Sequence, residues 1–67
     1  MRTKQIDKRE FYKRVSDLYD EYMVLTTDGI FTDIGDNWMP FYRIVHNGND
    51  IIAIISLGEE NTITFHK

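Results

Sequence analysis

The sequence predicts an α+β domain in two layers, with an N-terminal helix packed on a four- or five-stranded antiparallel β-meander. Apolar residues recur at helical spacing between residues 7 and 21, and beyond residue 22 short apolar runs alternate with turn residues. The chain has 67 residues and no cysteine, so it can bury one small core without disulfide support. We therefore expect a single domain over residues 1–67, of which residues 1–6 form a basic N-terminal arm.

The helix is predicted by the spacing of its apolar side chains and by its first residues. Asp7 can cap the helix start, and Glu10 follows at the spacing of a capping box. Steps of four, three and four residues place the apolar side chains on one stripe, which consists of Phe11, Val15, Leu18 and Tyr22. A helix with one apolar stripe has to pack on another element, and the remaining chain offers a sheet.

Strands are predicted from Tyr22 onward in five runs: YMVLTT, IFTDI, WMPFYRIVH, IIAIISL and TITFH. Asp28 with Gly29, and Asn47 with Gly48, are typical of two-residue hairpin turns. Pro40 has no N–H to donate to a sheet ladder. We therefore expect that the start of its strand lies at an edge or a bulge, or that Pro40 precedes the strand.

The run at residues 51–57 has apolar side chains on both of its faces, which is typical of a central strand that is buried on both sides. Together with the helix stripe, it contributes most of the expected core. The predicted core residues are Phe11, Val15, Leu18, Leu25, Ile44, Ile52, Ile54 and Phe65.

Charge is distributed unevenly along the chain. Residues 1–14 hold six basic and two acidic side chains, a net charge of +4, whereas residues 15–67 hold two basic and nine acidic ones, a net charge of −7. No Lys or Arg occurs between Val15 and Tyr42. This layout indicates either a solvated acidic face or a surface for a basic partner.

No motif for catalysis or metal binding is recognisable. His46 and His66 lack a nearby nucleophile motif and further metal ligands, so we expect them to face solvent at strand ends. The acids at residues 33–36 do not match the register of a calcium loop. Arg43 alone is interleaved with the aromatic residues of the sheet, which disfavours direct nucleic-acid binding. We expect no enzymatic activity, cofactor or metal.

The first ten residues contain no apolar segment of a signal peptide, and no run reaches the roughly 18 apolar residues of a membrane span. The absence of cysteine fits a reducing compartment. We therefore expect a cytoplasmic protein that does not bind membranes.

The segment MVLTTD at residues 23–28, preceded by Asp20 and Glu21, is similar to a strand of the phage uracil-DNA glycosylase inhibitor family. That strand has the pattern Met, aliphatic, Leu, Thr, small hydroxyl, Asp, and it also follows an Asp-Glu pair. In both chains a Trp, here Trp38, precedes an apolar strand, an Asn-Gly turn and an Ile-containing strand. The resemblance covers at most residues 20–55.

The resemblance implies that Met23 and Leu25 line an apolar cavity that receives a side chain from the DNA-intercalating loop of the glycosylase. It also implies that Asp28 replaces a DNA phosphate. The ordinary alternative is that Met23 and Leu25 are the core face of a strand. The family's Glu-Ser-aliphatic edge strand is absent here, so we expect residues 30–37 to replace it. The expected partner-binding residues are Glu21, Met23, Leu25, Asp28, Asp33 and Asp36.

These observations predict a small acidic inhibitor of a DNA-processing enzyme that acts as a DNA mimic, with uracil-DNA glycosylase as the expected partner. Carboxylates on a rigid strand can occupy a groove that evolved for phosphates, and they also accelerate association by electrostatic steering. The alternative is a non-catalytic regulatory module whose sheet edge pairs with a strand of a partner or of a second copy. We expect the protein to be a monomer or a weak dimer.

Overall fold

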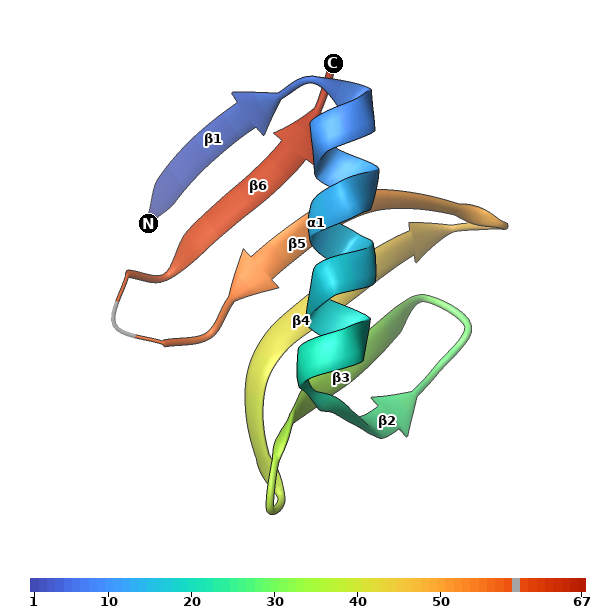
Figure 1. Ribbon diagram of the computed structural model, residues 1–67, viewed down its shortest axis with the longest axis vertical. Helices are drawn as coiled ribbons and strands as arrows, with labels where there is room; N and C mark the ends of the chain where they lie inside the picture. The colour runs from blue at the N-terminus through green and yellow to red at the C-terminus, as the bar shows by residue number, and fades with distance from the viewer. Residues whose placement is uncertain (59) are drawn as a thin grey trace.

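The computed structural model describes residues 1–58 and 60–67, which form one helix packed on one face of a six-stranded sheet (Figure 1). The strand order is β1-β6-β5-β4-β3-β2; β1 pairs with β6 in parallel and the other neighbours are antiparallel. The α+β class is confirmed, whereas the four- or five-stranded antiparallel meander is wrong. The elements are β1 (Arg2–Ile6), α1 (Lys8–Glu21), β2 (Met23–Thr27), β3 (Phe31–Asp36), β4 (Met39–Asn47), β5 (Asp50–Ser56) and β6 (Thr62–His66).

The strand β1 replaces the expected N-terminal arm. It lies beside β6 with Arg2 opposite Thr62 and Ile6 opposite His66. Only Ile6 of its five residues is partly buried, so β1 shows no apolar alternation from which a strand could be predicted. Its existence depends on hydrogen bonds to the other end of the chain.

The helix α1 begins and packs as its sequence predicts. The side chain of Asp7 caps it by accepting a hydrogen bond from the backbone N–H of Arg9, at 3.0 Å. Its stripe of Phe11, Val15 and Leu18 is buried against the sheet. The helix ends at Tyr22, where the backbone becomes extended and leads directly into β2.

The core lies between this stripe and the middle of the sheet. Ile34, Ile44 and Ile54 supply its sheet side from three neighbouring strands, and all are buried. Five of the predicted core residues are confirmed, and Ile34 is an additional one. The confirmed residues are Phe11, Val15, Leu18, Ile44 and Ile54.

Three predicted core residues are not fully buried. Leu25 and Ile52 are the extra residues where the register shifts between β2 and β3 and between β4 and β5, and such bulges change the direction of side chains. Ile52 is 40% exposed. Phe65 is partly buried, and its register places it on the sheet face away from α1. The prediction that these three residues are core residues is wrong.

The strand β5 lies inside the sheet between β4 and β6, as its sequence predicts. The expectation that it is buried on both sides is wrong, because α1 covers only one face of the sheet (Figure 1). In the described part of the chain, α1 is not long and apolar enough to cross a membrane.

The hairpin turns lie close to their predicted positions. Gly48 has φ 61° and, with Asn49, joins Asn47 of β4 to the paired residue of β5. The β3–β4 turn consists of Asn37 and Trp38, which both have positive φ, as in the hairpin turns that match strand twist. Pro40 lies inside β4 next to a register shift between β3 and β4, so of the three alternatives for this position the bulge is confirmed.

Candidate protein-binding site

An open cavity of about 530 Å³ lies where the C-terminal end of α1 meets β2 and the β3–β4 hairpin. Three of its lining residues carry carboxylates, and three others provide aromatic or apolar walls. We call it the acidic cavity. It is lined by Asp20, Glu21, Tyr22, Met23, Gly35, Asp36 and Phe41.

The cavity is assembled from three elements that are separate in the sequence. Met23 begins β2 and pairs with Gly35 of β3, which places Asp36 beside the end of α1. The ring of Tyr22 lies 5.4 Å from that of Phe41 in an edge-to-face arrangement. The helix end and the hairpin are thereby held together.

Gly35 allows β3 and β4 to approach closely at the base of the hairpin. A Cβ atom at this position would collide with the carbonyl oxygen of Met39 and would lie 2.9 Å from the amide nitrogen of Phe41. The neighbouring register shift makes Phe41 the extra residue of β4. Phe41 lines the cavity as a consequence.

The carboxylates of the acidic cavity are not neutralised by salt bridges. Among residues 1–58 and 60–67, salt bridges join Lys13 to Asp17 and Arg43 to Asp33, and none involves an acid of the cavity. Two of these acids, Asp20 and Glu21, lie in the last turn of α1, which contains no basic residue. A negative charge there is unfavourable by about 0.3–1 kcal/mol because the helix dipole is negative at its C-terminus. Helix stability therefore does not explain why Asp20 and Glu21 occupy the last turn of α1.

Tyr22 provides a neutral wall beside these charges. Burial raises the pKa of its hydroxyl group above 10.0, and the charge of Glu21 raises this pKa further. The phenol therefore stays protonated at neutral pH. An aromatic ring beside carboxylates suits a guanidinium or ammonium group, which can form charge-assisted hydrogen bonds and a cation–π contact.

Within the described ranges, 1–58 and 60–67, no group of three or more His, Cys, Asp or Glu side chains is placed to hold a metal ion.

Large apolar side chains are exposed at the same end of the molecule. Trp38, at the tip of the β3–β4 hairpin, is 94% exposed and has φ 73°. Positive φ is unfavourable for a bulky residue, so this position is not optimised for stability. Met39 and Met23 are also exposed. Exposed Trp and Met beside charged residues are typical of a protein–protein interface.

The structure brings three of the six expected partner-binding residues together. Glu21, Met23 and Asp36 all line the acidic cavity. Leu25 is partly buried in the bulge of β2 and does not line the acidic cavity. Asp28 lies at the other end of β2, where its carboxylate accepts a hydrogen bond from the amide of Ile30 at 3.1 Å.

Asp33 differs from the expectation of an exposed acid. It is 9% exposed, and its two carboxylate oxygens accept hydrogen bonds from Nε and an Nη atom of Arg43 at 2.8 and 3.0 Å. Its charge is therefore matched within the protein. The sequence did not indicate Asp20, Trp38 and Phe41 as site residues. Asp20 could have been included because it is adjacent to Glu21 in the sequence. The position of Phe41 at the site depends on the bulge in β4, which the sequence pattern does not show.

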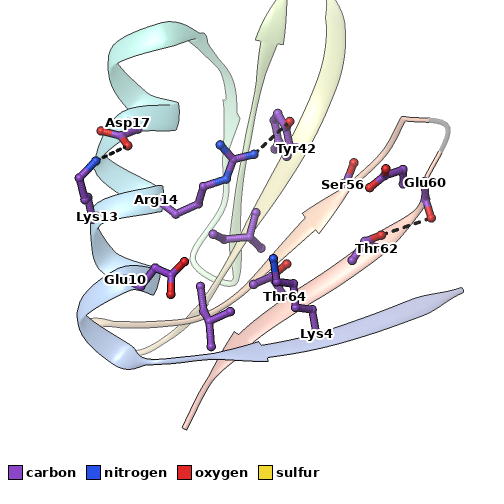
Figure 2. A pocket seen from close by; sticks show the side chains of 12 residues that line it. Lys4, Glu10, Lys13, Arg14, Asp17, Tyr42, Ser56, Glu60, Thr62 and Thr64 are labelled. Carbon is purple, nitrogen blue, oxygen red and sulfur yellow. Dashed lines mark hydrogen bonds and ion pairs between the residues drawn. The ribbon is translucent and has the colours of Figure 1, made fainter.

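A second cavity, of about 450 Å³, lies between α1 and the half of the sheet formed by β5, β6 and β1 (Figure 2). Its charged residues have both signs and are partly matched. Lys13 forms a 3.0 Å ion pair with Asp17, and Arg14 donates a 3.5 Å hydrogen bond to the hydroxyl of Tyr42. This mixture favours no single class of ligand, unlike the acidic cavity.

The two histidines are structural rather than solvent-facing, so the expectation for them is wrong. The Nε2 atom of His46 lies 3.0 Å from Oγ1 of Thr32. The Nε2 atom of His66 lies 3.2 Å from the carbonyl oxygen of Ile51, and its ring lies 4.8 Å from that of Phe11. Neither histidine lines the acidic cavity.

Comparison of the chain with protein-family models, curated proteins and solved structures found no match. The similarity of residues 20–55 to the glycosylase inhibitor family therefore stays a resemblance between short motifs.

Proposed function

We propose that the protein inhibits a DNA-processing enzyme by placing acidic groups in its DNA-binding groove. The observation that carries this proposal is the acidic cavity, where Asp20, Glu21 and Asp36 line the same space as the exposed Met23 and have no salt-bridge partners in the described chain. A DNA-binding groove presents Lys and Arg to phosphates, and carboxylates can take the positions of these phosphates. Uracil-DNA glycosylase is the first target to test, because residues 23–28 resemble its inhibitor family.

The exposed apolar residues would provide slow dissociation from the enzyme, which carboxylates alone do not provide. Charges on a surface accelerate association but are screened by salt, whereas a desolvated aromatic anchor slows dissociation. In this proposal Trp38 enters a pocket of the enzyme, while Met23 and Phe41 contact a side chain that enters the acidic cavity. Met23 keeps the role that the resemblance implies, and Phe41 takes that of Leu25.

Asp28 extends the acidic surface along the edge of the sheet. It follows β2, which is an edge strand, and the acidic cavity lies at the beginning of the same strand. The distance from Met23 to Asp28 along an extended strand is roughly 16 Å, which corresponds to about five base-pair steps of DNA. The two ends of β2 can therefore reach separate phosphate sites in one groove.

A uracil-excision assay titrated with the purified protein tests the proposal. We expect inhibition near stoichiometric ratio, with slower association at about 200 mM than at about 50 mM salt because screening weakens steering. The triple variant Asp20→Asn, Glu21→Gln, Asp36→Asn should associate at least about tenfold more slowly. The matched control is Asp17→Asn, which also removes acidic charge from α1 but lies outside the acidic cavity.

No inhibition at about tenfold molar excess would exclude uracil-DNA glycosylase as the target. Equal effects of the Asp17 substitution and the triple variant, after correction for the number of charges, would show that overall charge rather than the acidic cavity is responsible. Testing the triple variant against a second DNA-groove enzyme, such as a nuclease, then separates a wrong target from a wrong mechanism.

The alternative function, pairing through a sheet edge, has less support. The edge strand β2 is interrupted by the bulge at Leu25, and the edge strand β1 carries Arg2 and Lys4. Bulges and basic residues both discourage the addition of another strand.

A further inference from the structure

The sheet face opposite α1 is apolar, and no helix or strand of the described chain covers it (Figure 1). Backbone alternation places the neighbours of the buried Ile44 and Ile54 on this side. Two rows of side chains cross β3, β4, β5 and β6 there; Asp33 is buried and the other members are partly exposed. We call this surface the open face; its rows are Phe31, Val45, Ala53 and Phe65, then Asp33, Arg43, Ile55 and Ile63.

The open face carries no unbalanced charge. Asp33 and Arg43 are the charged members of its two rows, and they form a two-point ion pair with each other. The guanidinium carbon of Arg43 also lies 4.0 Å from the centre of the Phe31 ring, so its flat face is already stacked. A partner of opposite charge is therefore not required, and a second copy of the same surface would meet no net like charge.

The molecule exposes more surface than a folded monomer of its mass is expected to expose. Its accessible surface of 4839 Å² exceeds the about 4,450 Å² expected for that mass. The molecule measures 32 × 27 × 20 Å, and the sheet extends across the two longer dimensions (Figure 1). Packing of the open face against a second copy would reduce this excess of accessible surface.

We propose that two copies of this chain pack face to face through their open faces. Sheets that pack in this way lie ~10 Å apart with nearly aligned strands, and a two-fold axis brings the same residues of both copies together. Ala53 has the smallest side chain of its row and lies between Val45 and Phe65. It leaves room for a side chain of the other copy. The helices then lie on the two outer surfaces, and this inference does not depend on the inhibitor function.

Sedimentation equilibrium over about micromolar to millimolar concentrations tests the proposal, and we expect a dimer that dissociates on dilution. Ile55→Lys should raise the dissociation constant on the order of 100-fold or more, because two buried charges of the same sign would face each other. Val24→Lys is the matched control. Val24 is 52% exposed on β2 and lies outside the open face, so this change should leave the dimer intact.

Three further experiments keep the proposal testable if one variant does not fold. Ile63→Lys repeats the test on β6, and far-UV circular dichroism identifies unfolded protein. Isotope-filtered NMR on a mixture of labelled and unlabelled unsubstituted copies should show contacts between Ile55, Ile63 and Val45 of different molecules. A monomer at millimolar concentration, a dimer that survives both folded Lys variants, or intermolecular contacts confined to β1 or β2 would each overturn the proposal.

Discussion

The carboxylate of Asp33 receives two hydrogen bonds from the guanidinium of Arg43, which also stacks on the ring of Phe31. The hydrogen bonds from Arg43 to Asp33 raise the pKa of the guanidinium above its usual range, so the guanidinium stays charged. A planar two-point contact fixes both side chains on the open face. Asp33 is therefore a structural acid, whereas Asp36 is exposed in the acidic cavity.

Asp33→Asn should consequently lower the melting temperature by about 5 °C or more, because an amide cannot replace both charged contacts and leaves Arg43 without a counter-charge. Asp36→Asn removes the same charge from an exposed site and should lower the melting temperature by less than about half as much. Thermal unfolding at one fixed protein concentration compares the two variants. Equal shifts would contradict the structural role of Asp33.

Tyr22 should make the stability of the protein sensitive to high pH. Burial and Glu21 raise the pKa of its hydroxyl in the folded state above 10.0, the ordinary value that the unfolded chain keeps. At a pH below that value, Tyr22 is protonated in both the folded and the unfolded state, and its contribution to the free energy of unfolding is complete. As pH rises through and beyond it, the unfolded state ionises first and this contribution is lost.

The free energy of unfolding should therefore fall more steeply above about pH 10 in the unsubstituted protein than in Tyr22→Phe, which cannot ionise there. Urea denaturation between about pH 8 and pH 11 measures the difference. Glu21→Gln should reduce the effect without abolishing it, because burial is its larger cause. A constant difference between the unsubstituted protein and Tyr22→Phe across this range would disprove the argument.

At the scale of elements, the parallel pairing of β1 with β6 has a definite hydrogen-bond pattern. The amide of Arg2 donates to the carbonyl of Asn61 at 3.3 Å, and the amide of Lys67 donates to the carbonyl of Ile6 at 3.1 Å. Backbone groups alternate in direction along a strand. The N–H of Lys4 therefore points toward β6, and that of its neighbour points to the free edge.

Lys4→Pro should accordingly disrupt β1, whereas Thr3→Pro should be tolerated, because only the first removes a donor that faces β6. Amide hydrogen exchange measured by NMR distinguishes the two. The alternation places the amide of Phe65 opposite the carbonyl of Lys4, and we expect its exchange to accelerate at least about tenfold in Lys4→Pro alone. If both proline variants exchange alike, β1 does not pair as described.

Bulges determine which side chains reach the surface sites. The extra residues Leu25, Phe41 and Ile52 each interrupt the regular alternation of a strand. Phe41 thereby lines the acidic cavity, and Leu25 does not line it. The candidate site therefore depends on local irregularities of the sheet rather than on its regular ladder.

For the whole molecule, charge is separated along α1 and the sheet. Basic residues occupy β1 and the first half of α1, whereas the last turn of α1 and the β3–β4 hairpin are acidic and lie together at the opposite end (Figure 1). Such a separation orients a protein in the field of a charged partner before contact. The open face lies on the sheet surface away from α1, so the inhibition assay and the oligomeric state test two separate surfaces.

The sequence by itself determined the features that depend on neighbouring residues. Side-chain spacing and backbone preferences within a few positions predict Asp7 as the cap, the buried stripe of α1 and the turn at Gly48. Part of the acidic cavity could also be predicted from the sequence, because Glu21 and Asp36 belong to a segment without basic residues.

Only the tertiary structure decided how distant segments meet. The strand β1, the ion pair between Asp33 and Arg43, and the joining of α1 to the hairpin through Phe41 all require a particular register between strands. A shift of one residue in that register moves a side chain to the other face of the sheet. The energy that selects the register comes from packing and hydrogen bonds across the whole fold, so a local pattern of residues does not contain it.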